Sequence, residues 1–380
     1  MENKFGLDKH LPKELRLLLE ILKVENESQF WKIREELFIN IDWELFLQIV
    51  RHHRVHPLIY SKINKIGEKL IPAYVIETLS QEYKKNTFQM LQLSGEMEQL
   101  SKLFTENQIR ILFLKGPVIA ADLYGDISLR TSKDLDILIP IRDLQSAEKL
   151  LLNYGYEKEE FPWDEWKWMN HHVTFFHPQK RIQIEIHWRL HSPPSEEPNF
   201  NNLWERKRSS LLTTYPVFLL GEEDLFLFLV AHGARHGWFR LRWLIDIDQM
   251  IKKGLQTERV HFFLLDYQYH HMVGQALILA NHLLNTTIDE GFNKLTTEKY
   301  SQKLAQRSLP FIKEMSNFNY QKDYLFLLKS KKQKFLYIMR ILFFPSSQDT
   351  KTLRLPKSIH VLYFPLRPFL WAWRKTNRST

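Results

Sequence analysis

The stretch from residue 109 to residue 190 constrains the fold more than any other part of the chain. Short apolar runs occur at 109–114, 135–140, 171–176 and 181–188, and the last of them alternates apolar and polar side chains. Runs of this length and composition predict β-strands. Between the runs, Gly116-Pro117 and Gly125 bound one predicted helix, and a second is expected over 143–153. The pattern predicts a compact β-α-β-α-β-β module.

The segments on either side of this module have helical patterns. Five apolar residues follow one another at intervals of three or four, which places them on one face of a helix: Met90, Leu93, Met97, Leu100 and Phe104. After Pro193-Pro194 the chain again favours helices. We therefore expect an α+β protein with a small mixed β-sheet core at 108–192. Helical regions should occupy 1–107 and 193–328, and a basic, aromatic-rich tail at 329–380 should pack on the body or extend from it.

The composition removes several classes of function. The chain has 380 residues and no cysteine, which excludes disulfide scaffolds, thiol catalysis and iron–sulfur clusters. No apolar run reaches the length of a membrane helix, and no apolar signal core follows the first residues. We therefore expect a soluble, cytoplasmic protein without a transmembrane segment.

Most of the net positive charge lies at the end of the chain. Residues 329–380 contain 12 Lys or Arg and one acid, whereas the remaining chain has 41 basic and 43 acidic residues. A run of this kind is most often a solvated helix face. With its aromatic residues it is also compatible with an anionic membrane, a peptide or single-stranded nucleic acid, of which nucleic acid is the less favoured partner.

Three acids in the module are arranged for metal-assisted chemistry. Asp134 and Asp136 are two residues apart on a predicted strand, so both carboxylates point to the same face. Glu185 lies on the polar face of a later strand and joins them if the two strands are neighbours. Oxygen ligands of this kind suit Mg²⁺, and two such ions can clamp an in-line phosphoryl displacement. The alternative is that the Asp-x-Asp pair is a solvated strand face.

Four further residues surround these acids in the predicted module. Lys115 and Gly116 precede a helix whose free N–H groups favour a phosphate, unless the segment is a simple strand–helix turn. Arg130 could hold a phosphate with two nitrogens or be a surface arginine. His187 lies on the acidic face and could orient Glu185 or touch a substrate.

A histidine pair four residues apart occurs in the second helical region. His232 and His236 share one helix face, with Arg235 and Arg240 close by in sequence. The group could line a substrate cleft, with either arginine contacting phosphate. The other readings are a zinc site and ordinary helix packing.

The segment LFLKGPVIAADLYGDISLRTSKDLDILIP (112–140) resembles the uncharacterised nucleotidyltransferase family, a branch of the DNA polymerase β-like nucleotidyltransferase superfamily. HHRVHPLIY (52–60) and HGARHGWFRLRWLIDI (232–247) also resemble flanking segments of this branch. The resemblance implies that Gly116 is the helix-start glycine, that Asp134 and Asp136 are the paired metal ligands, and that Glu185 is the third acid. Pro117 stands where the family usually has Gly or Ser.

The resemblance also implies an activity: a two-metal transferase, using Mg²⁺ with Mn²⁺ as the alternative, that moves a nucleoside monophosphate from a nucleoside triphosphate to an unknown hydroxyl or phosphate acceptor. One alternative keeps the fold but uses a nucleotide sugar. The enzyme would then glycosylate or otherwise modify a peptide or phosphopeptide, such as a lasso peptide. A second alternative is a catalytically inactive nucleotide-binding or regulatory module.

Overall fold

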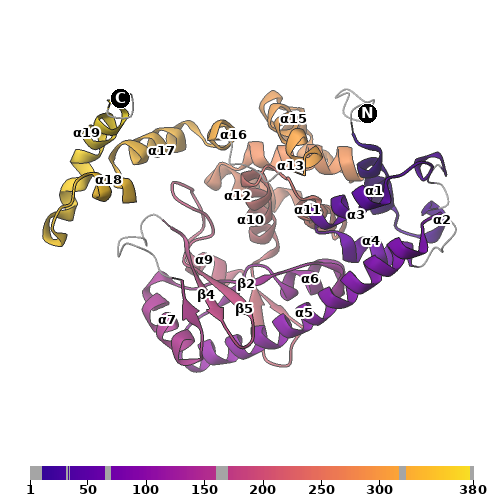
Figure 1. Cartoon of the computed structure of the whole chain (residues 1–380), viewed down its shortest axis with the longest axis horizontal. Coiled ribbons are helices and arrows are strands. Elements are labelled where there is room, and N and C mark those ends of the chain that lie inside the picture. Colours follow the sequence, from indigo (N-terminus) through magenta and orange to yellow (C-terminus); the bar gives the residue numbers. More distant parts are fainter. Residues whose placement is uncertain are drawn as a thin grey trace.

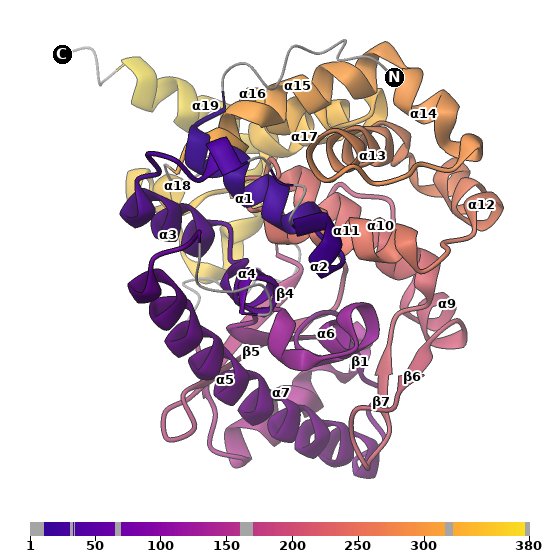
Figure 2. The ribbon, with the colours of Figure 1, turned by 90° about the vertical axis from the view of Figure 1, so that its right-hand side faces the viewer.

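The computed structural model describes residues 11–30, 33, 35–64, 70–159, 170–315 and 322–376. Its first part is helical, as the apolar spacing predicts. The helices are α1 (Lys13–Lys23), α2 (Glu27–Phe30), α3 (Trp43–His52), α4 (His56–Ile63) and the long α5 (Ala73–Glu106). The stripe from Met90 to Phe104 is buried along α5. In Figure 2, α5 runs across the molecule beside the sheet and α6.

A seven-stranded mixed sheet forms the α/β part. Its strands are β1 (Leu112–Phe113), β2 (Asp134–Leu138), β3 (Glu157–Lys158), β4 (His172–His177), β5 (Ile182–His187), β6 (Arg208–Ser210) and β7 (Val217–Leu219). They lie in the order β3-β4-β5-β2-β1-β7-β6. Strands β2 and β5 are parallel neighbours at the centre, and β1 is parallel to β7. Helices α6 (Pro117–Tyr124) and α7 (Leu144–Asn153) connect the first strands.

The predicted strands are present, but their lengths differ in places from the prediction. Only two residues of the apolar run 109–114 form β1, because only Leu112 and Phe113 pair with residues of the neighbouring strands β2 and β7. Within the region expected to be helical, β6 and β7 form a hairpin that adds two strands to the sheet. The sheet therefore includes a segment that lacks a long alternating pattern in the sequence.

The remaining chain is helical and lies over one edge of the sheet (Figure 1). It comprises α9 (Phe200–Glu205), α10 (Glu222–Arg235), α11 (Leu241–Lys252), α12 (Thr257–Tyr267), α13 (His270–Leu284), α14 (Asn293–Thr297), α15 (Lys299–Lys313), α16 (Lys322–Leu327), α17 (Lys331–Phe343), α18 (Ser347–Thr352) and α19 (Tyr363–Thr376). Helix α13 packs against α1, α10, α11 and α15, which joins both helical regions in one core. None of the helices in the described part of the chain has the length and apolar character needed to cross a bilayer.

Candidate active site

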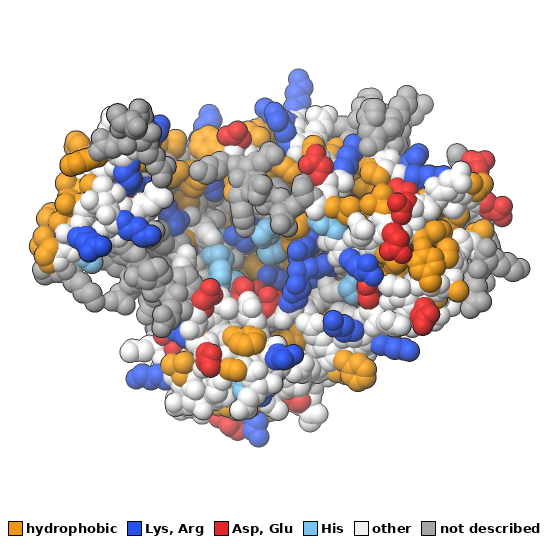
Figure 3. Space-filling model, in the orientation of Figure 1, with side chains coloured by type: hydrophobic (Ala, Val, Ile, Leu, Met, Phe, Trp, Pro, Cys, Tyr) orange, Lys and Arg blue, Asp and Glu red, His pale blue; other side chains and the backbone are white. Residues whose placement is uncertain are grey.

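A cavity of about 870 Å³ lies between the sheet and the helices above it. Its sheet wall consists of residues on β2 and β5 and the loops beside them. Its helical wall is formed by residues of α10 and α11 and of the loop between these helices. Ten of the eleven site residues predicted from the sequence line the cavity: Lys115, Arg130, Asp134, Asp136, Glu185, His187, His232, Arg235, His236 and Arg240. Figure 3 shows acidic, basic and histidine side chains around a hollow in the middle of this face.

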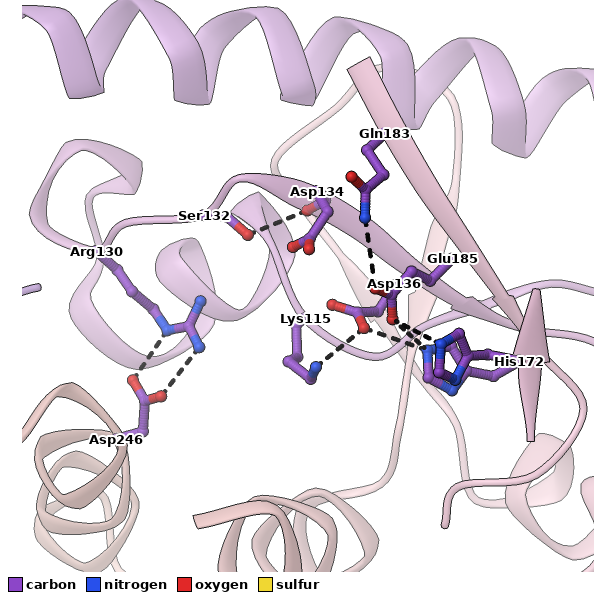
Figure 4. Close-up of polar contacts among 10 residues, drawn as sticks. Lys115, Arg130, Ser132, Asp134, Asp136, His172, Gln183, Glu185 and Asp246 are labelled. Carbon is purple, nitrogen blue, oxygen red and sulfur yellow. Dashed lines mark hydrogen bonds and ion pairs between the residues drawn. The ribbon is translucent and has the colours of Figure 1, made fainter. Parts of the chain in front are cut away.

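Strand register brings the acids of the sheet wall together. Asp136 is directly paired with Glu185 in the parallel ladder between β2 and β5. The apolar residues Leu135, Ile137 and Ile184 are fully buried, so the acids lie on the opposite side of each strand. In Figure 4 the carboxylates of Asp134, Asp136 and Glu185 project into the same region.

Two hydrogen-bond donors, one of them an ammonium group, compensate the charge of Asp136. Lys115 Nζ donates a hydrogen bond to Asp136 Oδ1 at 2.9 Å, and His187 Nε2 donates to the same oxygen at 3.2 Å. His187 Nε2 also lies 3.4 Å from Glu185 Oε2. The imidazole is therefore held between two carboxylates from neighbouring strands.

The acids of the sheet wall differ in their protonation. Burial and the neighbouring Asp136 carboxylate raise the pKa of Asp134 to about 6. Burial opposes ionisation of Asp136 as well, but Lys115 and the hydrogen bond from His187 hold its pKa well below the ordinary value. Burial likewise opposes the charge on His187, yet its hydrogen bonds to Asp136 and Glu185 raise its pKa. Near pH 6, Asp134 is thus the acid most readily protonated.

The helical wall is cationic and less well paired. Burial lowers the pKa of Arg242 to about 9 and that of Arg240 to about 10, so both remain mostly protonated at neutral pH. Their buried Nε atoms have no hydrogen-bond partner among the described residues. Burial and the positive charge of Arg235 lower the pKa of His236 to about 3, and burial lowers that of His232 well below its ordinary value. The arginines therefore carry the positive charge of this wall.

His232 on α10 and His236, the residue that follows the helix, are packed rather than arranged around a metal. Their ring centroids are 4.7 Å apart, and His236 stacks on Trp243 at 5.1 Å. Among the residues that the structure describes, the groups able to hold a metal lie elsewhere, on the sheet wall. The arrangement favours a lining or packing role over the zinc site.

Arg130 is tied to the helical wall by a buried ion pair. Its Nε and Nη2 atoms bind Asp246 Oδ1 and Oδ2 at 2.9 and 3.0 Å (Figure 4). Tyr124 donates a further hydrogen bond to Asp246 Oδ1 at 2.7 Å. Arg130 is therefore neither a surface arginine nor free to hold a phosphate with these two nitrogens, because it is buried and they bind Asp246. Nη1 remains buried without a hydrogen-bond partner among the described residues.

Gly116 is the one predicted site residue that does not line the cavity. It precedes α6 with φ at +90°, and a Cβ atom there would lie 3.3 Å from Leu135 Cδ2. A side chain at this position would be strained by both the backbone conformation and the close approach of β2. The glycine is required by the turn between β1 and α6.

Several cavity residues were not identified from the sequence. They come from segments far apart in the chain: Arg54, His191, Arg242, Lys329, Tyr337, Arg340 and Arg367. Arg54 and Arg242 lie in the two flanking segments whose family resemblance gave the only signal. The tail residues have no such signal, because a basic run in sequence does not reveal what it packs against.

The sheet wall fits a divalent cation. Asp136, Glu185 and His187 each offer a ligand atom, and these atoms lie within 4.8 Å of one another. His171, His172 and His187 form a second such group beside it. Carboxylate oxygens suit Mg²⁺ and Mn²⁺, and imidazole nitrogen is a better ligand for Mn²⁺ and other transition metals than for Mg²⁺. The donor set thus accepts either ion and gives Mn²⁺ a nitrogen ligand.

Comparison with known proteins gives the family. No protein of curated function matches the sequence significantly. Among solved structures, the chain is similar to the crystal structure of an antigenic nucleotidyltransferase-like protein from Paracoccidioides brasiliensis, with 15% sequence identity and a TM-score of 0.31 over 52% of this chain and 94% of that chain. The family model of the uncharacterised nucleotidyltransferases matches residues 40–285, from α3 to the end of α13. This match covers more than half of the chain and includes both walls of the cavity, so the chain belongs to the family of uncharacterised nucleotidyltransferases.

Proposed function

We propose that the protein is a metal-dependent nucleotidyltransferase that moves a nucleoside monophosphate from a nucleoside triphosphate to a hydroxyl or phosphate acceptor. The observation that carries the proposal is the pairing of Asp136 with Glu185 on adjacent parallel strands, with Asp134 on the same face. Family membership supports the same reaction class. The acceptor remains open.

In this proposal the sheet wall binds the cation and the helical wall binds the phosphates of the donor. Asp134, Asp136 and Glu185 would hold the cation, with His187 as an additional ligand or as a hydrogen-bond donor that orients two of the carboxylates. Bound Mg²⁺ or Mn²⁺ would supply a Lewis acid that neutralises charge on the phosphates and lowers the pKa of the acceptor hydroxyl. On the opposite wall, Arg240 and Arg242 supply positive charge for the phosphates of the donor.

Lys115 is placed to serve both walls. Its Nζ atom lies against Asp136 and 5.8 Å from the ring centroid of Phe228 on α10. If Asp136 instead held a cation, the ammonium group of Lys115 would be available to bind a donor phosphate. The start of the helix that follows is less well placed for this role, because Pro117 has no N–H to donate and neither Gly116 nor Pro117 lines the cavity.

Replacement of Asp136 tests the proposal. Transfer from radiolabelled nucleoside triphosphates is measured with Mg²⁺ and with Mn²⁺ in the wild type, Asp136→Asn and Glu157→Gln. Glu157 is an exposed acid on β3 of the same sheet and serves as the control. We expect Asp136→Asn to lower the rate by at least about a hundredfold and the control to keep full activity.

The transferred group is read by mass spectrometry of the acceptor fraction. A mass increase of one nucleoside monophosphate supports the proposal, and addition of a hexose from a nucleotide sugar would replace it with glycosyl transfer. Circular dichroism checks that both proteins are folded. If the wild type and Asp136→Asn are then equally active, these acids do not take part in the reaction. Metal-independent nucleotide binding without transfer would favour a regulatory module.

A further inference from the structure

The C-terminal helices form a surface that the proposed function does not use. Helices α17 and α19 pack together through Phe344 and Phe364, whose ring centroids are 5.2 Å apart. Arg340 attaches α17 to the loop after β5 by donating a hydrogen bond to the carbonyl oxygen of Pro193 at 2.7 Å. Figure 1 shows α17, α18 and α19 at one edge of the molecule, beside the body. This pair of helices and α18 are called the tail hairpin below.

The tail hairpin exposes large apolar side chains over much of its length. On α17, Phe335 is 61% exposed; before and along α19, Val361, Phe369 and Trp373 are 68, 72 and 62% exposed. In Figure 3 orange side chains cover the outer part of this region. An apolar surface of this kind normally marks a docking site, since isolated apolar residues rather than clusters are usual on a soluble surface.

The exposed charged side chains of the tail hairpin are all basic. Asp349 is the only acid between residues 329 and 380. It is buried and paired with Arg367 at 2.9 Å and Arg374 at 2.7 Å. Lys331 and Lys351 are exposed basic residues of the hairpin, and no exposed acidic side chain within residues 329–380 offsets their charge. The surface is complementary to an anionic partner.

We propose that the tail hairpin docks on the surface of a bilayer that contains anionic phospholipids. Tryptophan and basic residues together are typical of segments that lie at the level of the lipid headgroups. Exposed aliphatic residues such as Leu336 and Val361 gain burial in lipid, but they offer no stacking surface to the bases of a nucleic acid. This mixture favours a membrane over a nucleic acid.

Docking would bring the cavity close to the lipid headgroups. Tyr337 and Arg340 of α17 and Arg367 of α19 line the same cavity as the acids of the sheet wall. The docking proposal itself does not depend on the proposed function, because its test measures binding to vesicles and not transfer.

Vesicle sedimentation tests the proposal with the full chain. Vesicles of phosphatidylcholine are compared with vesicles that also contain phosphatidylglycerol, at low and high salt. The wild type is compared with a triple variant, Phe369→Ser, Trp371→Ser and Trp373→Ser. The matched control changes three residues that are equally exposed elsewhere, Phe88→Ser, Phe262→Ser and Leu265→Ser. Circular dichroism checks that all three proteins are folded.

We expect the wild type to bind vesicles with phosphatidylglycerol, and high salt to weaken this binding. The tail triple variant should bind at least about tenfold more weakly, since it removes apolar burial, and the control should bind like the wild type. Absence of binding to anionic vesicles overturns the proposal. So does equal binding of the tail variant and the wild type. A wild-type dimer in solution that the tail variant abolishes would also overturn it, because a second copy would then cover this surface.

Discussion

The two walls of the cavity handle their charges in opposite ways. On the sheet wall, the two directly paired acids have partners: Asp136 binds Lys115 and His187, and His187 also contacts Glu185. On the helical wall, Arg240 and Arg242 keep buried Nε atoms without a hydrogen-bond partner among the described residues. A carboxylate cluster is tolerable without substrate only if cations neutralise it, whereas arginines retain their charge even when partly buried. The sheet wall therefore keeps much of its charge paired within the protein, whereas the helical wall has buried positive charge that an anion could neutralise.

The ion pair between Arg130 and Asp246 joins the two walls and should have the largest effect on stability. Both side chains are buried, so Asp246→Ala leaves Arg130 and Tyr124 without their partner. We expect the free energy of unfolding to fall by about 3–5 kcal/mol in urea denaturation. The control is Glu106→Ala, which removes an exposed pair on α5 and should change stability by less than about 1 kcal/mol.

If Asp246→Ala is too unstable to purify, the double variant Arg130→Met, Asp246→Leu answers the same question. Replacing both charges with apolar side chains removes the unpaired buried arginine, so most of the lost stability should return. Equal instability of the single and double variants would show that packing at this position matters more than the charge.

Removal of the third acid sharpens the comparison on the sheet wall. Glu185→Gln keeps the shape of the side chain but removes a charge beside His187. We expect kcat to fall by about a hundredfold, with a change in KM for the nucleotide of less than about threefold. Steady-state kinetics with Mg²⁺ check this. A large rise in KM at constant kcat would place Glu185 in nucleotide binding instead.

The raised pKa of Asp134 predicts how the stability of the protein depends on pH. Its pKa of about 6 is raised above the ordinary value, so the ionised carboxylate disfavours the folded state at higher pH. Asp134→Asn should therefore raise the free energy of unfolding of the metal-free protein by about 2 kcal/mol at pH 8. The gain should shrink as the pH falls through 6 and vanish below about 3, where the carboxyl is neutral in both the folded and the unfolded state. Denaturation in EDTA at several pH values checks the trend, and a gain independent of pH would contradict it.

The helical wall should give a smaller effect. Arg240→Gln removes one positive charge that stacks on Phe239, with the guanidinium carbon 4.9 Å from the ring centroid. We expect the Kd for a non-hydrolysable nucleoside triphosphate to rise about tenfold, with little change in stability. Arg259→Gln on α12 is the control, since Arg259 is largely exposed and outside the cavity. Unchanged nucleotide binding in Arg240→Gln would remove this arginine from the anion site.

The sheet wall was largely predictable because strands follow a period of two. Residues 134 and 136 must share a face, and the alternating pattern of 181–188 places Glu185 and His187 together as well. Only the adjacency of β2 and β5 had to be assumed, and the two strands are indeed paired in parallel in the sheet. The helical stripe of α5 was predictable for the same kind of reason.

The other contacts could not be predicted, because they are set by tertiary structure. The ion pair of Arg130 with Asp246 on α11 could not be predicted, because no sequence pattern near Arg130 indicates a partner so far away in the chain. The β6–β7 hairpin has strands of three residues each, which are too short to leave a periodic pattern. Lys329 and Arg340 come from a basic run whose composition is the same whether it faces solvent or lines a cavity.

The start of α6 has a consequence for how substrate preference could change over evolution. A phosphate held by backbone amides depends on the course of the main chain, which point mutation alters little. Here Gly116 is committed to the turn, Pro117 has no N–H, and neither lines the cavity, so under the proposed function recognition of the donor would fall to exchangeable side chains. Members of the family that share this start could therefore acquire new donors through single substitutions on the opposite wall, without rebuilding the loop.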